Sequence, residues 1–161
     1  MNFAPCMPDS SDVSSADPVP SNLDYTLGLP GGAYCLSMAR KTVDRLLRAH
    51  DLADMAELAV LTTSELLTNA YLFTPGKPTS LSIRWRFGVL RLTVFDEHPR
   101  HPRNVRDACQ ARRRAALSTL DAALAACESL CCGLDEVGGP LAGNKMWVAF
   151  SRKTARNYER L

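Results

Sequence analysis

Two polar residues stand one helical turn apart in the stretch 57–76, ELAVLTTSELLTNAYLFTPG. Glu65 and Asn69 are separated by four residues, so a helix places them on the same side. A carboxylate in that position can act as a general base on water or on a hydroxyl, and an amide oxygen can complete the shell of a Mg²⁺ ion that holds phosphates. The alternative is a solvated Glu65 and an Asn69 bonded to nearby backbone, so the pair alone does not define a site.

The same stretch has the apolar pattern of a helix that packs on a sheet. At 100° per residue, six side chains fall in one stripe about 60° wide: Met55, Ala59, Thr62, Leu66, Ala70 and Phe73. Glu65 and Asn69 lie along one margin of this stripe, so we expect them where the core meets a cavity. Asp54 and Glu57 have the spacing of a capping box in front of the helix.

The remaining elements follow from alternation and helical spacing. Alternating apolar residues predict strands at 23–29, 80–87, 89–96, 134–137 and 145–150, the second and third forming a hairpin near Gly88. Helical spacing predicts helices at 33–49 and 105–131. Asp96 then lies where a strand ends and a loop begins. This order favours an α+β fold, a two-layer sandwich in which helices cover one face of a mainly antiparallel sheet.

Length and charge indicate a single domain without a strong electrostatic preference. The 161 residues carry 19 basic and 17 acidic side chains, a net charge of +2. We expect a disordered tail at 1–20, one domain at 21–150 and a basic tail at 151–161. The sequence shows no secretion signal and no apolar run long enough to span a membrane, which predicts a cytoplasmic protein.

Without a secretion signal, the six cysteines are interpreted as reduced, small apolar residues. They are Cys6, Cys35, Cys109, Cys127, Cys131 and Cys132. Cys127 and Cys131 share a helix face, which leaves zinc ligation open as an alternative. No CxxC pair accompanies them, and this argues for a structural role.

Four motifs, in this order and spacing, resemble those of one family. They are ARKTV at 39–43, SELLTNA at 64–70, VFDEHPRHP at 94–102 and GNKMWVAF at 143–150. Over residues 23–150 the chain resembles the bacterial anti-sigma-factor serine kinases, which belong to the histidine-kinase-like (GHKL) ATPase superfamily.

The resemblance implies the Bergerat fold of that superfamily, with an ATP site closed by a lid. It implies that Asn69 ligates Mg²⁺, that Glu65 is the general base, that Asp96 accepts a hydrogen bond from the adenine amino group and that Gly143 lies in the nucleotide site. It further implies that Arg40 contacts a sigma factor or an antagonist protein. The expected protein is an ATP-binding regulator, and a serine/threonine kinase if phosphate is transferred. Relatives of this kind pair through the sheet, which implies a homodimer.

The sequence departs from the family pattern where glycine should approach phosphate. His98 and Arg100 stand at two glycine positions after Asp96, and RRRAAL at 112–117 replaces a glycine-containing turn before the lid helix. We expect this segment to continue a helix. Met146 stands where many relatives have a threonine, and Phe73 replaces a histidine.

Two interpretations of these departures remain open. In the first, Arg112, Arg113 or Arg114 holds phosphate oxygens in place of the lost glycines, and ATP still binds. In the second, the nucleotide site is degenerate and the fold serves as a nucleotide-independent partner-binding module. The run of arginines at 100–114 also raises contact with nucleic acid. The absence of interleaved aromatic residues and of a helix-turn-helix pattern argues against it.

Overall fold

Five antiparallel strands form one sheet in the computed structural model, which describes residues 17–127, 132–137 and 142–161. Each neighbouring pair is antiparallel, in the order β1-β2-β3-β5-β4. The strands are β1 (Asp24–Leu29), β2 (Thr79–Arg86), β3 (Val89–Asp96), β4 (Cys132–Val137) and β5 (Gly143–Ser151). The helices are α1 (Tyr34–Ala49), α2 (Ala56–Phe73), α3 (Arg103–Ala115), α4 (Ser118–Ala126) and α5 (Arg152–Tyr158).

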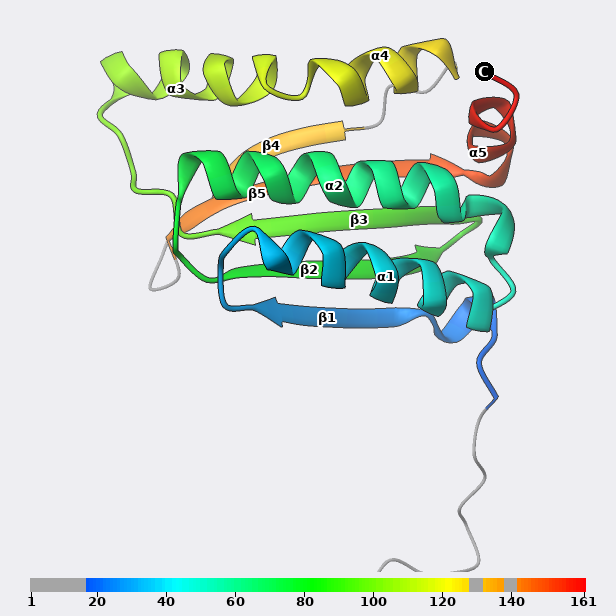
Figure 1. The fold of residues 1–161 in the computed structure, drawn as a ribbon. Coiled ribbons are helices and arrows are strands. Elements are labelled where there is room, and N and C mark those ends of the chain that lie inside the picture. Colours follow the sequence, from blue (N-terminus) through cyan, green and yellow to red (C-terminus); the bar gives the residue numbers. More distant parts are fainter. Residues whose placement is uncertain (1–16, 128–131, 138–141) are drawn as a thin grey trace, which may run out of the picture.

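The helices lie along one side of the sheet. α1 and α2 run side by side over its strands, and α3 and α4 follow one another alongside α2 (Figure 1). Short 3₁₀ turns precede β1 (η1, Pro20–Asn22) and α2 (η2, Ala53–Met55). The predicted α+β class, with an antiparallel sheet and helices on one face, is therefore confirmed at that level.

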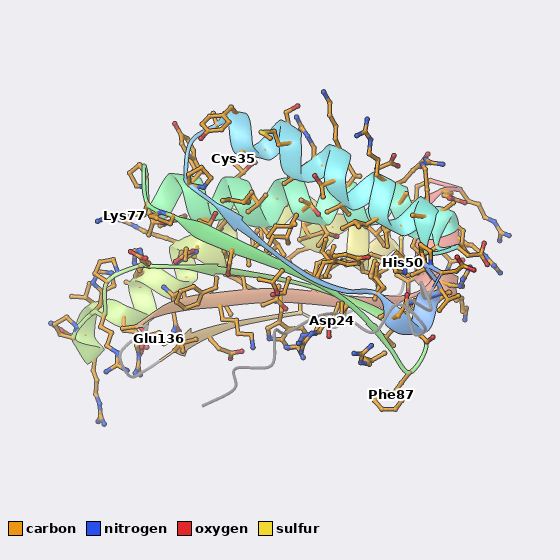
Figure 2. All side chains as sticks on the ribbon, turned by 90° about the horizontal axis from the view of Figure 1, so that it is seen from below. Asp24, Cys35, His50, Lys77, Phe87 and Glu136 are labelled. Atoms are coloured by element: carbon orange, nitrogen blue, oxygen red, sulfur yellow. The ribbon has the colours of Figure 1, made fainter. Side chains whose placement is uncertain are left out.

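Alternation along the strands sets the helix-facing side of the sheet. Leu81 and Ile83 of β2 and Leu92 and Val94 of β3 are fully buried beneath α1 and α2. The predicted hairpin turns at Phe87 and Gly88, which both have positive φ, as a two-residue type I′ turn requires. Phe87 projects from the tip of this hairpin into solvent (Figure 2).

α2 is the central helix, and its predicted stripe forms the middle of the core. Five of the six stripe residues are buried, and Phe73 is half-exposed. Leu58, Leu67 and Asn69, outside the stripe, are buried as well. α1 and α4 pack against α2 from its two sides, so the helix buries more of its circumference than a helix lying alone on a sheet.

Two expectations about the second half of the chain were wrong. The single helix predicted for 105–131 is divided, because α3 ends at Ala115 and α4 begins at Ser118. The basic tail predicted for 151–161 instead contains α5, in which Ala155 is buried against the core. Residues 1–16 of the predicted N-terminal tail lie outside the described residues.

Asp54 explains why α5 docks on the domain. It accepts hydrogen bonds from Arg152 at 2.7 Å and from Arg156 at 3.2 Å, and Arg152 also donates to the carbonyl oxygen of Asp51. The capping role predicted for Asp54 was wrong, because the helix begins beyond it and no side chain caps its N-terminus. The carboxylate instead neutralises two arginines of the C-terminal helix.

Candidate functional site

Asn69 lies on the last third of α2 and turns into the protein rather than toward solvent. Its Nδ2 group donates to the backbone carbonyl of Arg113 at 2.7 Å, and its Oδ1 accepts from Nε of the same arginine at 3.0 Å. Both ends of the amide are thus used by one residue of α3. This two-point contact fixes which way the amide faces.

Asp96 is the last residue of β3 and points to the helix-facing side of the sheet. Its Oδ1 accepts from Nη1 of Arg113 and from the backbone N–H of His98, both at 3.1 Å. Its Oδ2 accepts from Nη2 of Arg113. The carboxylate and the guanidinium therefore form a bidentate ion pair, the geometry that a planar arginine fork favours.

Arg113 reaches between Asn69 and Asp96 and joins them. Its Nη2 group also contacts Sδ of Met146 at 3.3 Å, and its guanidinium carbon lies 5.3 Å from the centre of the Phe73 ring. The exposed fractions of Arg113 and Asp96 are 0%, and that of Asn69 is 1%. We call Asn69, Asp96, Arg113, Met146 and Phe73 the buried cluster.

The polar groups of the buried cluster, those of Asn69, Asp96 and Arg113, hydrogen-bond to one another and are closed to solvent. The charge of Arg113 is balanced by Asp96, and each of its three guanidinium nitrogens has an acceptor within the cluster. A ligand reaches the carboxylate or the amide oxygen only if the guanidinium leaves. In this conformation, Asp96 and Asn69 bind the guanidinium of Arg113, a cation that belongs to the protein itself.

The structure brings together two of the three residues that the sequence analysis expected to converge. Asn69 and Asp96 meet through Arg113. Glu65, one turn before Asn69 on α2, is half-exposed, and no described residue hydrogen-bonds to its carboxylate. Glu65 therefore lies outside the network that holds the other two.

The three consecutive arginines take three different environments. Arg112 is exposed on α3. Arg114 is partly exposed, with its Nη2 group 2.9 Å from Sγ of Cys132 and 4.0 Å from the carboxylate of Asp121. Only Arg113 enters the protein, so the segment does not present a row of arginines to one ligand.

Gly143 is buried at the start of β5, directly beside the end of β3. A Cβ atom at this position would lie 2.1 Å from the carbonyl oxygen of Asp96 and 2.8 Å from the Phe95 ring. The absence of a side chain thus lets the two strands approach each other. Asn144, which pairs with Asp96 in the sheet, has a buried Oδ1 atom for which no described residue supplies a donor.

Arg40 lies on the exposed side of α1, away from the buried cluster. It borders a shallow hollow between α1 and the start of α2, which Lys41, Asp44, Glu57 and Val60 also line. The position is compatible with contact to another protein, and it takes no part in binding a ligand at Asn69 or Asp96.

A group of possible metal ligands that the sequence analysis missed lies next to the buried cluster. The ligand atoms of His98, His101 and Cys109 lie within 4.8 Å of one another. Burial lowers the pKa of His98 below its ordinary value of 6.5, so its imidazole is neutral near pH 7. The sequence signal was the pair of histidines in EHPRHPRN, of which only His98 had been assigned a place, at a glycine position of the family pattern.

The other cysteines that the structure describes belong to no such group of possible metal ligands. Cys35, Cys127 and Cys132, like Cys109, are free thiols, as predicted. Burial raises the pKa of Cys127, which keeps this thiol protonated and unreactive. Cys131, its potential zinc-binding neighbour, lies outside the described residues.

Fold and site together define an α+β protein with a buried, self-neutralised polar cluster at the junction of α2, α3 and the end of β3. Neither the models of known protein families nor the curated proteins include a match to this sequence. Within the described ranges, no helix is both long and apolar enough to cross a membrane.

Proposed function

We propose that the protein is a relative of the anti-sigma-factor serine kinases, with the histidine-kinase-like ATPase fold, that binds its partner without nucleotide. The observation that carries this proposal is the position of Arg113. A side chain of the protein itself occupies the two groups, Asn69 and Asp96, that the family resemblance assigns to Mg²⁺ and adenine.

The chemistry of the guanidinium supports the proposal, because it supplies the N–H donors that adenine would offer to Asp96 and the positive charge that a metal ion would offer to Asn69. Asp96 would accept an N–H bond from adenine, and here it accepts two N–H bonds from Arg113. Asn69 Oδ1 would coordinate a cation, and here it accepts from the cationic Nε–H group. Arg113 is therefore an internal replacement for the adenine amino group and the metal ion together.

The departures from the family pattern support the proposal because the substituted side chains contact the same guanidinium, that of Arg113. Phe73 and Met146 both replace polar residues, and both contact the guanidinium. Both side chains are apolar or polarisable surfaces that suit a planar guanidinium and offer nothing to a phosphate. Substitutions that suit a buried arginine, rather than a phosphate, have thus accumulated around one group.

We place the partner, a sigma factor or an antagonist protein, on α1. Arg40 borders the hollow between α1 and α2. Tyr34 and Met38, one turn apart on the same helix, each expose 61% of their surface. They lie on the flank of α1 that faces β1, whereas Arg40 lies on the flank that faces α2, so a partner that contacts both would cover the solvent side of this helix.

ATP-dependent phosphorylation of an antagonist is the second candidate. It is favoured because Asn69 and Asp96 both contact one side chain, that of Arg113, and because the half-exposed Glu65 lies one helical turn before Asn69. This activity requires Arg113 to leave the cluster, after which Glu65 would serve as general base and Asn69 would hold Mg²⁺.

A titration with a fluorescent ATP analogue and Mg²⁺ tests the proposal. We expect no saturable binding by the wild-type protein up to millimolar nucleotide, since the guanidinium must first be displaced. Arg113→Ala is expected to bind at least tenfold more tightly than wild type, while Arg112→Ala, the exposed neighbour, behaves as wild type. Saturable wild-type binding that is lost in Asn69→Ala would instead establish the second candidate.

The affinity for the partner should not depend on nucleotide. With a purified sigma factor or antagonist identified by capture, we expect the dissociation constant to change less than about twofold between excess Mg²⁺-ATP and apyrase with chelator. Arg40→Ala and Met38→Ala should weaken binding, whereas Arg48→Ala, at the other end of α1, should not. A tenfold increase in affinity with Mg²⁺-ATP would contradict nucleotide independence.

A further inference from the structure

His98, His101 and Cys109 meet beside the buried cluster, and neither proposed function uses their side chains. His98 and His101 belong to the segment between β3 and α3, and Cys109 lies in the middle of α3. Nε2 of His98 is 3.0 Å from Nε2 of His101 and 3.1 Å from Sγ of Cys109. The ligand atoms of two imidazoles and a thiol thus lie within 4.8 Å of one another.

The orientation of His98 is fixed by a backbone carbonyl. Its Nδ1 atom lies 3.2 Å from the carbonyl oxygen of Phe73, which can only accept, so Nδ1 carries the proton. Nε2 of the neutral ring then carries the lone pair. Metal-binding histidines are characteristically held in this way, with the second ring nitrogen donating to a carbonyl or carboxylate.

A single lone pair does not satisfy both neighbours. Nε2 of His98 has one acceptor direction, yet it is approached by a second imidazole nitrogen and by a sulfur atom. At most one of them can form a linear hydrogen bond to it. A cation bound between the three ligand atoms satisfies all three groups at once, because each group then contributes its own lone pair.

The spacing suits a small tetrahedral ion. With zinc bonds of about 2.0–2.1 Å to nitrogen and 2.3 Å to sulfur, neighbouring ligand atoms lie about 3.3–3.6 Å apart. Two of the three separations in the structure, 3.0 and 3.1 Å, reach this range if the side chains move by a few tenths of an ångström, and all three ligand atoms lie within 4.8 Å of one another. His101 and Cys109 are partly exposed, so an ion can enter from solvent.

We propose that His98, His101 and Cys109 form a zinc-binding site with one open position. Two neutral imidazoles and a thiolate are the ligand set that zinc favours, and a water molecule takes the fourth position. On binding, the Cys109 thiol loses its proton to solvent and its sulfur becomes a thiolate ligand; nothing is oxidised or reduced.

The location of the site ties zinc to the conformation of the buried cluster. Cys109 precedes Arg113 by one helical turn on α3, and the backbone N–H of His98 donates to Asp96. An ion bound by both segments therefore fastens α3 to the end of β3 while Arg113 is in place. Bound zinc would therefore stabilise the conformation in which Arg113 lies between Asn69 and Asp96.

Cobalt(II) is the probe for this site, because its spectrum reports both geometry and thiolate ligation. Titration of the reduced full-length protein should give the visible bands of tetrahedral cobalt and a near-ultraviolet thiolate-to-cobalt band, saturating at one equivalent. Zinc should abolish both. Cys109→Ser should lose the thiolate band, and the partly exposed His101→Ala should lower affinity by about 100-fold or more.

Cys132→Ser is the matched control, since Cys132 is also a partly exposed free thiol. We expect it to retain the wild-type spectrum. A thiolate band that survives in Cys109→Ser, or that disappears in Cys132→Ser, would overturn the assignment. So would a wild-type protein that binds neither cobalt nor, by calorimetry, zinc. Circular dichroism of each variant verifies that it is folded, and the result does not depend on whether nucleotide binds.

Discussion

Asp96→Ala is expected to lower the free energy of unfolding by about 3–5 kcal/mol, because it leaves the guanidinium of Arg113 buried without its counter-ion. Both carboxylate oxygens pair with this arginine, and neither residue is exposed to water. If Asp96 instead faced an open nucleotide site, its removal would weaken ligand binding and leave stability nearly unchanged. Urea denaturation followed by circular dichroism measures the difference.

Two variants make this result interpretable. Asp24→Ala breaks exposed ion pairs with Arg84 and Arg86 and should cost about 1 kcal/mol or less. The double variant Asp96→Leu/Arg113→Met replaces the buried pair by apolar side chains, and it should recover most of the loss in Asp96→Ala. A loss in Asp96→Ala no greater than in Asp24→Ala would show that Arg113 does not depend on this carboxylate.

The strands and the two N-terminal helices could be predicted from the sequence because their signals are local. Alternation placed β1, β2 and β3 within about one residue of their observed ends. The break between α3 and α4 was missed because residues 112–118 contain neither glycine nor proline. α5 was missed because its binding to the domain depends on Asp54, which is about a hundred residues earlier in the chain.

The convergence of Asn69 and Asp96 was predictable, but the residue that joins them was not identified. Three adjacent arginines look alike in composition, and only helical phase separates them. Arg113 continues the spacing of Leu117, Leu120 and Leu124, all of which are buried. This periodicity would have indicated that Arg113 faces the protein while Arg112 faces solvent.

The histidine–cysteine group was beyond sequence reasoning for a different reason. Its geometry depends on how the proline-containing segment after Asp96 returns to α3, and no periodicity governs such a segment. In the structure, the carbonyl of Phe73 at the end of α2 orients His98. A residue far away in the chain thus decides which nitrogen faces Cys109.

Gly143→Ala is expected to destabilise the protein by about 3 kcal/mol or more, although it adds a single methyl group. The added Cβ would overlap the backbone carbonyl of Asp96 at 2.1 Å, and backbone within a paired strand cannot rotate away as a flexible side chain can. β5 must therefore move away from β3 at the point where Asp96 holds Arg113. Thermal and urea denaturation would measure the loss.

Gly28→Ala in β1 is the control for this substitution, because its added methyl group would have no described residue within 4 Å apart from its two chain neighbours. It should be neutral or slightly stabilising, since alanine loses less conformational entropy on folding than glycine. Because Gly143→Ala and Asp96→Ala both disturb the support of Arg113, their combined cost should be smaller than the sum of the two. Strict additivity, or a Gly143→Ala protein as stable as Gly28→Ala, would mean that the close approach of β5 does not support the buried cluster.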